Sequence, residues 1–397
     1  TDNQTLRNNI YAALVENNYK IKTEEERKMV YSFIEREITD IFDTNIMINS
    51  LDKNHDLLIF ALENEIHINK NAILNLLSFL FNSKTIMTVK YSYFSKNEKE
   101  QSFAIETLDN ILPSNLKRTI LPLFEKNINE NINGKYIFSS GRNSQILEFN
   151  SYKEVLNYIL TLNYNTISEW TKSVTIYSIN KKDFNDFKDI LINILENDNN
   201  LIVIETALTK IFENDKNLFL SIVNNNVKIF KNKIIKEIVE YFLKILSQKE
   251  VKKMYSTIEK ILILKQVDIF SQTPPEYLAD IATVIEEIEV SSGEKIMNKG
   301  DIGTSMYIIV EGKLKVFDGQ KELAILKDKD VVGELSALDP EPRSASVIAI
   351  EDSILFKIDK NSLYQIISEN VEITKGIIKV LCDRIRKSNA IIFNTNK

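Results

Sequence analysis

Glycine is distributed very unevenly along this chain of 397 residues. Of the nine glycines, Gly134 and Gly141 precede residue 290, and the other seven follow it. Glycine costs about 1 kcal/mol relative to alanine inside a helix, whereas tight turns between strands need it. The sequence therefore predicts an α+β protein with a helical first two-thirds and a last third that contains β-structure.

The helical part shows a 3.6-residue apolar period in successive segments. Three stripes illustrate it: Phe184, Phe187, Leu191 and Ile194; Ile204, Ala207, Leu208 and Ile211; Ile235, Ile238, Val239, Phe242 and Ile245. Short polar breaks, such as "ENDNN" and "ENDKN", separate these stripes. Helix pairs that recur about every forty residues predict a HEAT-like α-solenoid over residues 1–255. A single irregular helical bundle is the alternative.

The period changes from 3.6 to 2 after Gly293. The segment "SMYIIVEGKLKVFDGQKELAIL" predicts three strands with turns at Glu311-Gly312 and Asp318-Gly319, because Asp-Gly favours two-residue hairpins. Another strand is expected in "EDSILFKIDK". Short strands joined by glycine turns predict a β-roll (jelly-roll) at about residues 286–360, flanked by helices, in a second domain of residues 256–397.

Composition and charge exclude several classes of protein. The net charge is −6 and no basic cluster stands out, so we expect no nucleic-acid partner. No apolar run reaches the length of about 18 residues that a membrane span needs, and no signal peptide is recognisable. The single cysteine, Cys382, excludes an internal disulfide framework and fits a cytoplasmic location.

Candidate catalytic and metal-binding groups are scarce. His55 and His67 are the only histidines and have no cysteine partner, so we expect no metal site. No Ser/His/Asp or Cys/His set clusters in the sequence. We therefore expect a protein that is not an enzyme and that carries no cofactor.

The segment "VVGELSALDPEPRSASV" concentrates residues that can bind an anion. A short helix beginning at Gly333 would expose backbone N–H groups and partial positive charge, and glycine would let a ligand approach. Arg343 offers a bidentate fork to a phosphate. Glu334 would repel a phosphate, so we assign it to an adjacent ribose hydroxyl. Together these residues predict a cyclic mononucleotide pocket.

The same residues carry a family resemblance. "GELSALDPEPRSASV" resembles the phosphate-binding cassette of cyclic nucleotide-binding domains, and the resemblance extends over about residues 256–390. It implies that Glu334 holds the ribose 2′-hydroxyl and that Arg343 holds the cyclic phosphate, with cAMP as the expected ligand. It also implies contacts from Gly333, from the amides of Leu335 and Ser336, and from Ser344, which follows the arginine.

The cassette departs from the family pattern in two respects. Val332 stands where the family usually has an aromatic residue, and Asp339 and Glu341 add negative charge near the anion site. We expect the flanking prolines to direct both acids outward and Arg343 to be solvated, contributing little to folding. The alternative is a degenerate, non-binding domain that keeps its cassette as architecture, with Glu334 capping the short helix.

The resemblance further implies a C-terminal lid helix at about residues 371–389 that closes over the base. Leu381, Arg384 and Ile385 are the lid candidates, although a core stripe explains the two apolar residues equally well. A transcription regulator of the catabolite activator type would need a helix-turn-helix after this helix. Only "IIFNTNK" remains there.

The helical part carries a second resemblance. "ILNLLSFLFNSKTI", "AIETLDNILPSNLKRTILPLFE" and "ISEWTKSVTIYSI" resemble the HEAT repeats of bacterial ATP/ADP translocase-like transporter proteins that also contain a cyclic nucleotide-binding domain. This implies a cytoplasmic regulatory part, tethered to an upstream membrane domain and not itself inserted in the membrane. The start at Thr1 fits a processed or truncated piece. The alternative function is a protein-interaction scaffold. "KNINENINGKYIFSSGRNSQ" predicts an irregular loop.

Overall fold

The computed structural model describes residues 3–95, 97–125, 147–225, 232–249, 252–334, 339, 341–369, 373–382, 385 and 386. The loop expected at "KNINENINGKYIFSSGRNSQ" lies wholly outside these residues. The chain forms two compact units, residues 1–191 and 192–397. The division predicted between residues 255 and 256 stays a prediction.

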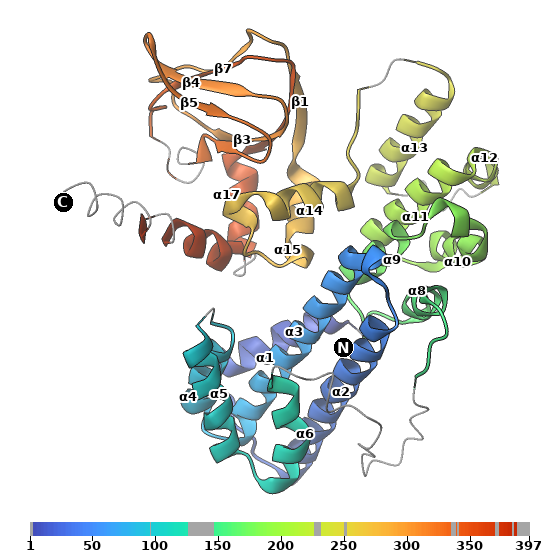
Figure 1. Cartoon of the computed structure of the whole chain (residues 1–397), viewed down its shortest axis with the longest axis vertical. Helices are drawn as coiled ribbons and strands as arrows, with labels where there is room; N and C mark the ends of the chain where they lie inside the picture. The colour runs from blue at the N-terminus through green and yellow to red at the C-terminus, as the bar shows by residue number, and fades with distance from the viewer. Residues whose placement is uncertain are drawn as a thin grey trace. The chain divides into compact units, whose positions relative to one another are not determined.

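The first unit is helical throughout its described secondary structure. Its elements are α1 (Gln4–Glu16), α2 (Glu24–Asn49), η1 (Lys53–His55), α3 (Asp56–Leu80), α4 (Ser83–Tyr93), α5 (Glu98–Ile111), α6 (Ser114–Phe124), α8 (Tyr152–Thr161), α9 (Glu169–Tyr177), η2 (Lys181–Asp183) and the first half of α10 (Phe184–Asn197) (Figure 1). Besides its neighbours along the chain, α3 also packs against α1 and α9. A central helix is typical of a bundle, and the HEAT-like solenoid stays a prediction.

Buried carboxylates lie in the interior of the first unit. Glu37 on α2 accepts hydrogen bonds from Arg7 on α1 (3.3 Å) and from Arg36 (3.2 Å). Desolvation by burial raises the pKa of Asp40, one turn further along α2, to about 8. Among the described residues, no group of histidine, cysteine and acidic side chains is placed to hold a metal ion.

The second unit begins with helices that the sequence predicts. They are α11 (Leu201–Asn214), α12 (Lys216–Asn225), α13 (Lys233–Leu246), α14 (Thr257–Gln266), η4 (Asp268–Phe270) and α15 (Pro275–Val284). Ala207, Leu208 and Ile211 on α11 are fully buried, as the predicted stripe requires. The polar breaks supply helix caps: the side chain of Asn200 accepts hydrogen bonds from the N–H groups of Ile202 and Val203.

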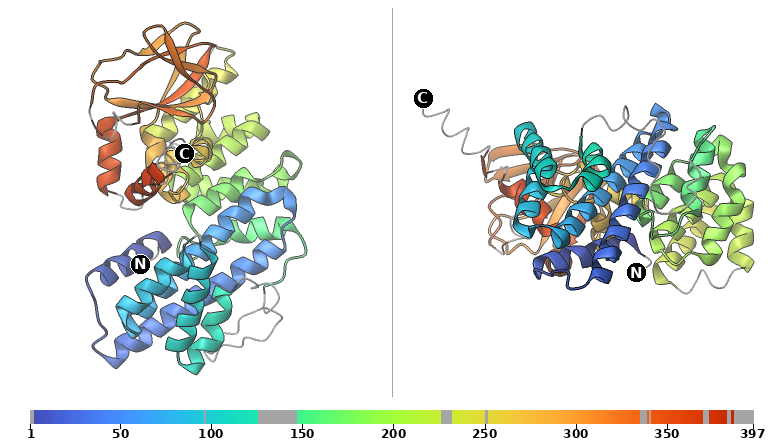
Figure 2. Two further views of the ribbon diagram at one scale, coloured as in Figure 1. Left: turned by 60° about the vertical axis from the view of Figure 1, so that its left-hand side comes forward. Right: turned by 90° about the horizontal axis from the view of Figure 1, so that it is seen from below.

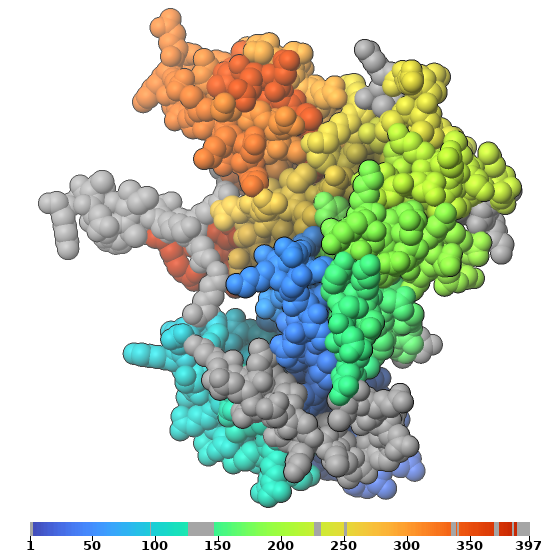
Figure 3. Space-filling model, turned by 45° about the vertical axis from the view of Figure 1, so that its right-hand side comes forward, coloured from blue at the N-terminus to red at the C-terminus, as the bar shows by residue number. Residues whose placement is uncertain are grey.

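Two four-stranded antiparallel sheets form the predicted roll. The strands are β1 (Glu286–Val290), β2 (Lys295–Met297), β3 (Ser305–Glu311), β4 (Leu314–Asp318), β5 (Lys321–Leu326), β6 (Val331–Val332), β7 (Ser346–Ala349) and β8 (Ser353–Asp359). One sheet has the order β1-β8-β3-β6 and the other β2-β7-β4-β5. Figure 2 shows the roll from two further sides, and Figure 3 shows it as one continuous orange surface.

Glycine turns confirm both predicted turns of the roll: the first crosses from one sheet to the other, and the second closes the β4–β5 hairpin. Gly312 joins β3 to β4 with a φ of +112°, and Gly319 joins β4 to β5 with a φ of +59°. Both values lie in the left-handed region, which glycine occupies at little cost. A buried apolar cluster fills the space between the sheets: Val290, Met297, Ile309, Leu314, Val347, Ala349 and Leu355.

Helix α14 forms polar contacts both with α11 and with the roll. Its first N–H, from Thr257, donates to the buried Glu205 carboxylate on α11 over 2.8 Å. Lys260 on α14 forms a 2.9 Å ion pair with Glu287 on β1, and Glu287 also accepts from the N–H of Tyr255. Both side chains of this ion pair are largely buried.

The C-terminal part of the second unit is helical again. Helix α17 (Lys360–Glu369) follows β8 directly, and residues 373–382 are also helical. Nowhere in the described parts of the chain does a helix combine the length and the apolar character needed to cross a membrane.

Candidate anion pocket in the β-roll

Backbone pairing brings the two ends of the cassette together. Val331 and Val332 of β6 pair with Ile308 and Tyr307 of β3, which places Gly333 beside the start of β3. At the other end, the N–H of Arg343 donates to the carbonyl of Asp301 over 2.8 Å. The arginine backbone is therefore held by the turn that precedes β3.

The Arg343 side chain is held by two backbone carbonyls. Its Nη1 donates to the carbonyl of Gly333 over 3.1 Å, and its Nη2 donates to the carbonyl of Ser305 over 2.5 Å. Only 8% of Arg343 is exposed. The expectation of a solvated arginine is wrong, because two segments distant in sequence close around this side chain.

Burial also affects the electrostatics of the guanidinium. Desolvation lowers the pKa of Arg343, while the charges of Tyr307 and Glu334 act in the opposite direction. A guanidinium stays protonated in proteins at ordinary pH. The pocket therefore contains a fixed and partly desolvated cation.

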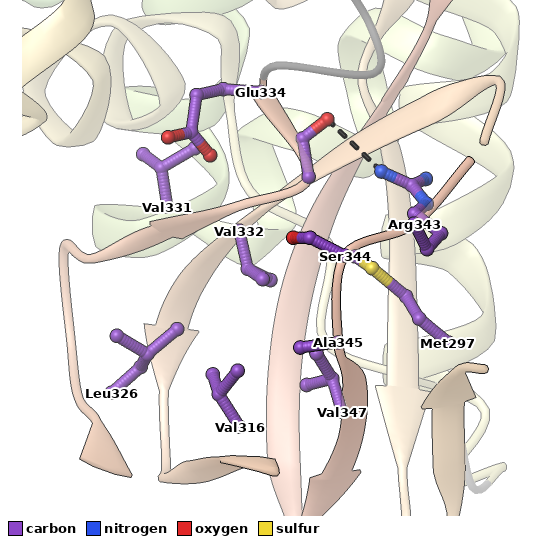
Figure 4. A pocket seen from close by; sticks show the side chains of 11 residues that line it. Met297, Val316, Leu326, Val331, Val332, Glu334, Arg343, Ser344, Ala345 and Val347 are labelled. Carbon is purple, nitrogen blue, oxygen red and sulfur yellow. Dashed lines mark hydrogen bonds between the residues drawn. The ribbon is translucent and has the colours of Figure 1, made fainter. Parts of the chain in front are cut away.

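A cavity of about 240 Å³ opens beside this arginine. Its lining residues are Met297, Val316, Leu326, Val331, Val332, Gly333, Glu334, Arg343, Ser344, Ala345 and Val347. Figure 4 shows the polar side chains towards one end and Val316, Leu326 and Val347 at the other. The volume lies just below the range of about 300–1,000 Å³ of common ligand sites, which suits one small amphipathic ligand.

The structure brings together four of the predicted site residues. Gly333, Glu334, Arg343 and Ser344 all line this cavity, and Ser344 is exposed to solvent. Leu335 and Ser336 lie outside the described residues, so the contacts assigned to their amides stay predictions.

The departures from the family pattern are compatible with the pocket. Asp339 and Glu341 are both exposed to solvent. Val332 lines the cavity as an apolar wall residue in place of the usual aromatic side chain.

The two described lid candidates, Leu381 and Ile385, are not among the residues that line the cavity. Leu381 is half-buried, 60% of Ile385 is exposed, and Arg384 lies outside the described residues. The buried face of this helix consists instead of Ile373, Ile377 and Val380. The assignment of lid residues stays a prediction.

Sequence reasoning missed several residues that line the cavity or hold Arg343 in place. Met297 and the carbonyl of Ser305 come from the strands that precede the cassette. Gly303 is also involved, since a Cβ built there would lie 2.3 Å from Cζ of Arg343. A backbone carbonyl leaves no trace in a sequence, whereas the glycine in "KGDIGTS" was a signal that could have been followed.

The family comparison agrees with this geometry. Residues 287–370 match the model of the cyclic nucleotide-binding domain. The matched segment contains most of the roll, the cassette and α17. The C-terminal region of the chain is therefore a cyclic nucleotide-binding domain.

Two curated relatives match this chain over about a third of its length or less. A CRP-like cAMP-activated global transcriptional regulator of Mycobacterium tuberculosis is 30% identical over 132 residues, which cover 32% of this chain and 59% of the regulator. A cAMP-dependent protein kinase regulatory subunit of Hypocrea atroviridis is 32% identical over 26% of this chain and 22% of the subunit. The chain thus spans less than two thirds of either relative.

Among solved structures, one similar chain is a bacterial regulator. The catabolite activator protein of Thermus thermophilus is 25% identical with a TM-score of 0.30, over 32% of this chain and 63% of that chain.

Proposed function

We propose that the roll binds a 3′,5′-cyclic mononucleotide and that the chain is a regulatory module controlled by this ligand. The observation that carries the proposal is the fixed Arg343 guanidinium in the wall of a small cavity that also contains Glu334. Two of its five N–H donors bond to backbone carbonyls, which leaves the others for an anion.

The two ends of the cavity suit the two parts of such a ligand. The cyclic phosphate would bind Arg343 through charge-assisted hydrogen bonds, and Glu334 would accept from the ribose 2′-hydroxyl. The aliphatic side chains of Val316, Leu326 and Val347 would cover the base. A free inorganic anion would use only the polar end.

We further propose cAMP as the natural ligand. The names of the similar proteins from Mycobacterium tuberculosis and Hypocrea atroviridis both specify cAMP. The aliphatic walls offer a base little beyond apolar contact, so the choice between cyclic nucleotides depends on Ser344 and on shape. Direct comparison of cAMP, cGMP, cCMP and cUMP tests this assignment.

The helical part is proposed to be a HEAT-like array that transmits or receives the signal. The tie of α14 to both Glu205 and Glu287 supports a mechanical link between the α11 region and the roll. The cytoplasmic location and the upstream transporter-like domain rest on the sequence resemblance alone. The upstream reading frame tests the transporter context.

We also propose that the bound nucleotide is not chemically changed. Arg343 and Glu334 can bind a cyclic phosphate and its ribose, but the described lining holds no histidine and no cysteine. Incubation with cAMP followed by chromatography tests this proposal, and formation of 5′-AMP would contradict it.

One observation favours a second function, in which the pocket binds no cyclic nucleotide and the chain is a protein-interaction scaffold. Arg343 already bonds to two carbonyls of its own domain, so it can act as a purely structural tie. Titration calorimetry separates the two functions. Heat with at least one of the four cyclic nucleotides supports the sensor, and its absence at millimolar concentration supports the scaffold.

A further inference from the structure

Arg343 lies in a narrow slot between two glycines that come from different segments. A Cβ built on Gly303 would lie 2.3 Å from Cζ and from Nε of Arg343, and 2.8 Å from its Nη2. A Cβ built on Gly333 would lie 2.4 Å from its Nη1. Real Cβ atoms do not approach other heavy atoms this closely, so the guanidinium occupies space that any other residue would fill.

The two glycines have different reasons to be glycine. Gly333 has a φ of +82°, a backbone conformation that residues with a side chain adopt only with strain. Gly303 has no such φ, so its backbone conformation would accept an ordinary residue. The nearest neighbours of a Cβ at Gly303 are three atoms of the Arg343 guanidinium. Glycine at position 303 thus leaves free the space that the Arg343 guanidinium occupies.

From this geometry we infer that Gly303 is a positioning residue of the anion site, although it lies outside the cassette and does not line the cavity. This inference rests on the proposed function. A methyl group at Gly303 would push the flexible end of Arg343 out of the slot and away from the carbonyls of Gly333 and Ser305. The phosphate would then meet a displaced guanidinium, and the fold would be kept.

The test is a double-mutant cycle between Gly303→Ala and Arg343→Ala, measured by calorimetry with cAMP. Gly303→Ala in the wild-type background is expected to weaken binding about three- to tenfold. In the Arg343→Ala background it is expected to change nothing, because the slot is already empty. Thr304→Ala, at the exposed next residue, is the matched control and should bind like wild type.

A second readout needs no nucleotide. In the free protein, Gly303→Ala should lower the Tm by about 2–4 °C through loss of the two Arg343 hydrogen bonds. In the Arg343→Ala background the same change should not lower the Tm. Circular dichroism of all four proteins shows whether each variant folds.

The outcomes separate the two claims. If the wild type binds cAMP and Gly303→Ala binds equally well, the inference is wrong and the proposed function stands. If the wild type binds no cyclic nucleotide, the proposed function fails. The Tm values of the four proteins in the double-mutant cycle then decide whether Gly303 positions Arg343. An equal fall in Tm in both backgrounds would overturn it, because Gly303 would then serve the backbone and not the arginine.

Discussion

The buried carboxylate of Glu205 accepts a 2.8 Å hydrogen bond from the backbone N–H of Thr257, the first residue of α14. The first N–H groups of a helix have no partner within the helix, and an acidic side chain there is also favoured by the helix dipole. Glu205 thereby fixes the start of the helix that leads into the cyclic nucleotide-binding domain.

Glu205→Ala should therefore destabilise the second unit. Loss of a buried acceptor is expected to lower the free energy of unfolding by roughly 1–3 kcal/mol. Affinity for cAMP should change little, since Glu205 does not line the cavity. Urea unfolding measures the first effect, with Glu205→Gln as the control because its amide oxygen can still accept. Equal destabilisation by both variants would contradict a role based on this hydrogen bond.

Arg343→Ala should weaken cAMP binding by roughly ten- to a hundred-fold, which corresponds to loss of a charge-assisted contact of about 1.5–3 kcal/mol. The burial of Arg343 adds an effect on folding: the carbonyls of Gly333 and Ser305 lose their donor, so unfolding should also become easier. Calorimetry and thermal unfolding on the same samples measure both. Wild-type affinity in this variant would place the ligand elsewhere.

Glu334 is predicted to recognise the ribose and not the phosphate. Glu334→Gln should weaken binding of cAMP about tenfold, since a carboxylate accepts from a hydroxyl more strongly than an amide oxygen does. The same substitution should have little effect on binding of 2′-deoxy-cAMP, which lacks the hydroxyl. Equal losses with both ligands would show that Glu334 acts on the shape of the cassette instead.

The first unit should lose stability as the pH rises. The pKa of Asp40 is raised to about 8 from 3.8 by burial and by the neighbouring charge of Glu37, with Arg7 and Arg36 opposing the shift. The folded chain thus holds a proton that the unfolded chain has released, and each pH unit between about 4 and 8 removes up to about 1.4 kcal/mol.

Asp40→Asn isolates this contribution, because asparagine has the same shape and does not titrate. Urea unfolding of the first unit at pH 5 and pH 8 should show a smaller loss in the variant than in the wild type. Burial also raises the pKa of Asp43 to about 6, so part of the slope below pH 7 should remain. An unchanged slope in Asp40→Asn would exclude Asp40 as its source.

The sequence was informative wherever the chemistry is local. Glycine at Gly312 and Gly319 marked two turns between strands, and the cassette pattern identified Glu334 and Arg343 as residues of one pocket. The sheet order β1-β8-β3-β6 was not predictable, because it depends on pairing between strands far apart in the chain.

The burial of Arg343 escaped prediction for the same reason. Its slot is formed by backbone from the start of β3. The backbone carbonyl of residue 305 would accept the same hydrogen bond with any side chain at that position. The apolar period and the composition of a sequence describe side chains only. They therefore cannot predict a site that is built from backbone groups of distant segments.

The last prediction concerns how the nucleotide signal leaves the pocket. Helix 373–382 is anchored by Ile373, Ile377 and Val380, and Gly376 lies so close to Thr273 that a Cβ there would be 2.5 Å from its Oγ1. This helix therefore contacts the segment between η4 and α15. Helix α14, which precedes that segment, donates a hydrogen bond to Glu205 and forms an ion pair with Glu287. A ligand that shifts the C-terminal helix has a packed route to α11.

Saturating cAMP should therefore change hydrogen exchange at residues 373–382, with a smaller change at residues 256–285. A ligand can move the C-terminal helix only if it binds more tightly to one position of that helix than to the other. The change in hydrogen exchange should therefore increase with the fraction of protein that holds cAMP. Arg343→Ala, which we expect to fold but to bind weakly, is the control and should show neither change at the same cAMP concentration. Protection limited to residues 290–360 would reject the relay, because binding would then be confined to the roll and nothing would reach the helices on either side.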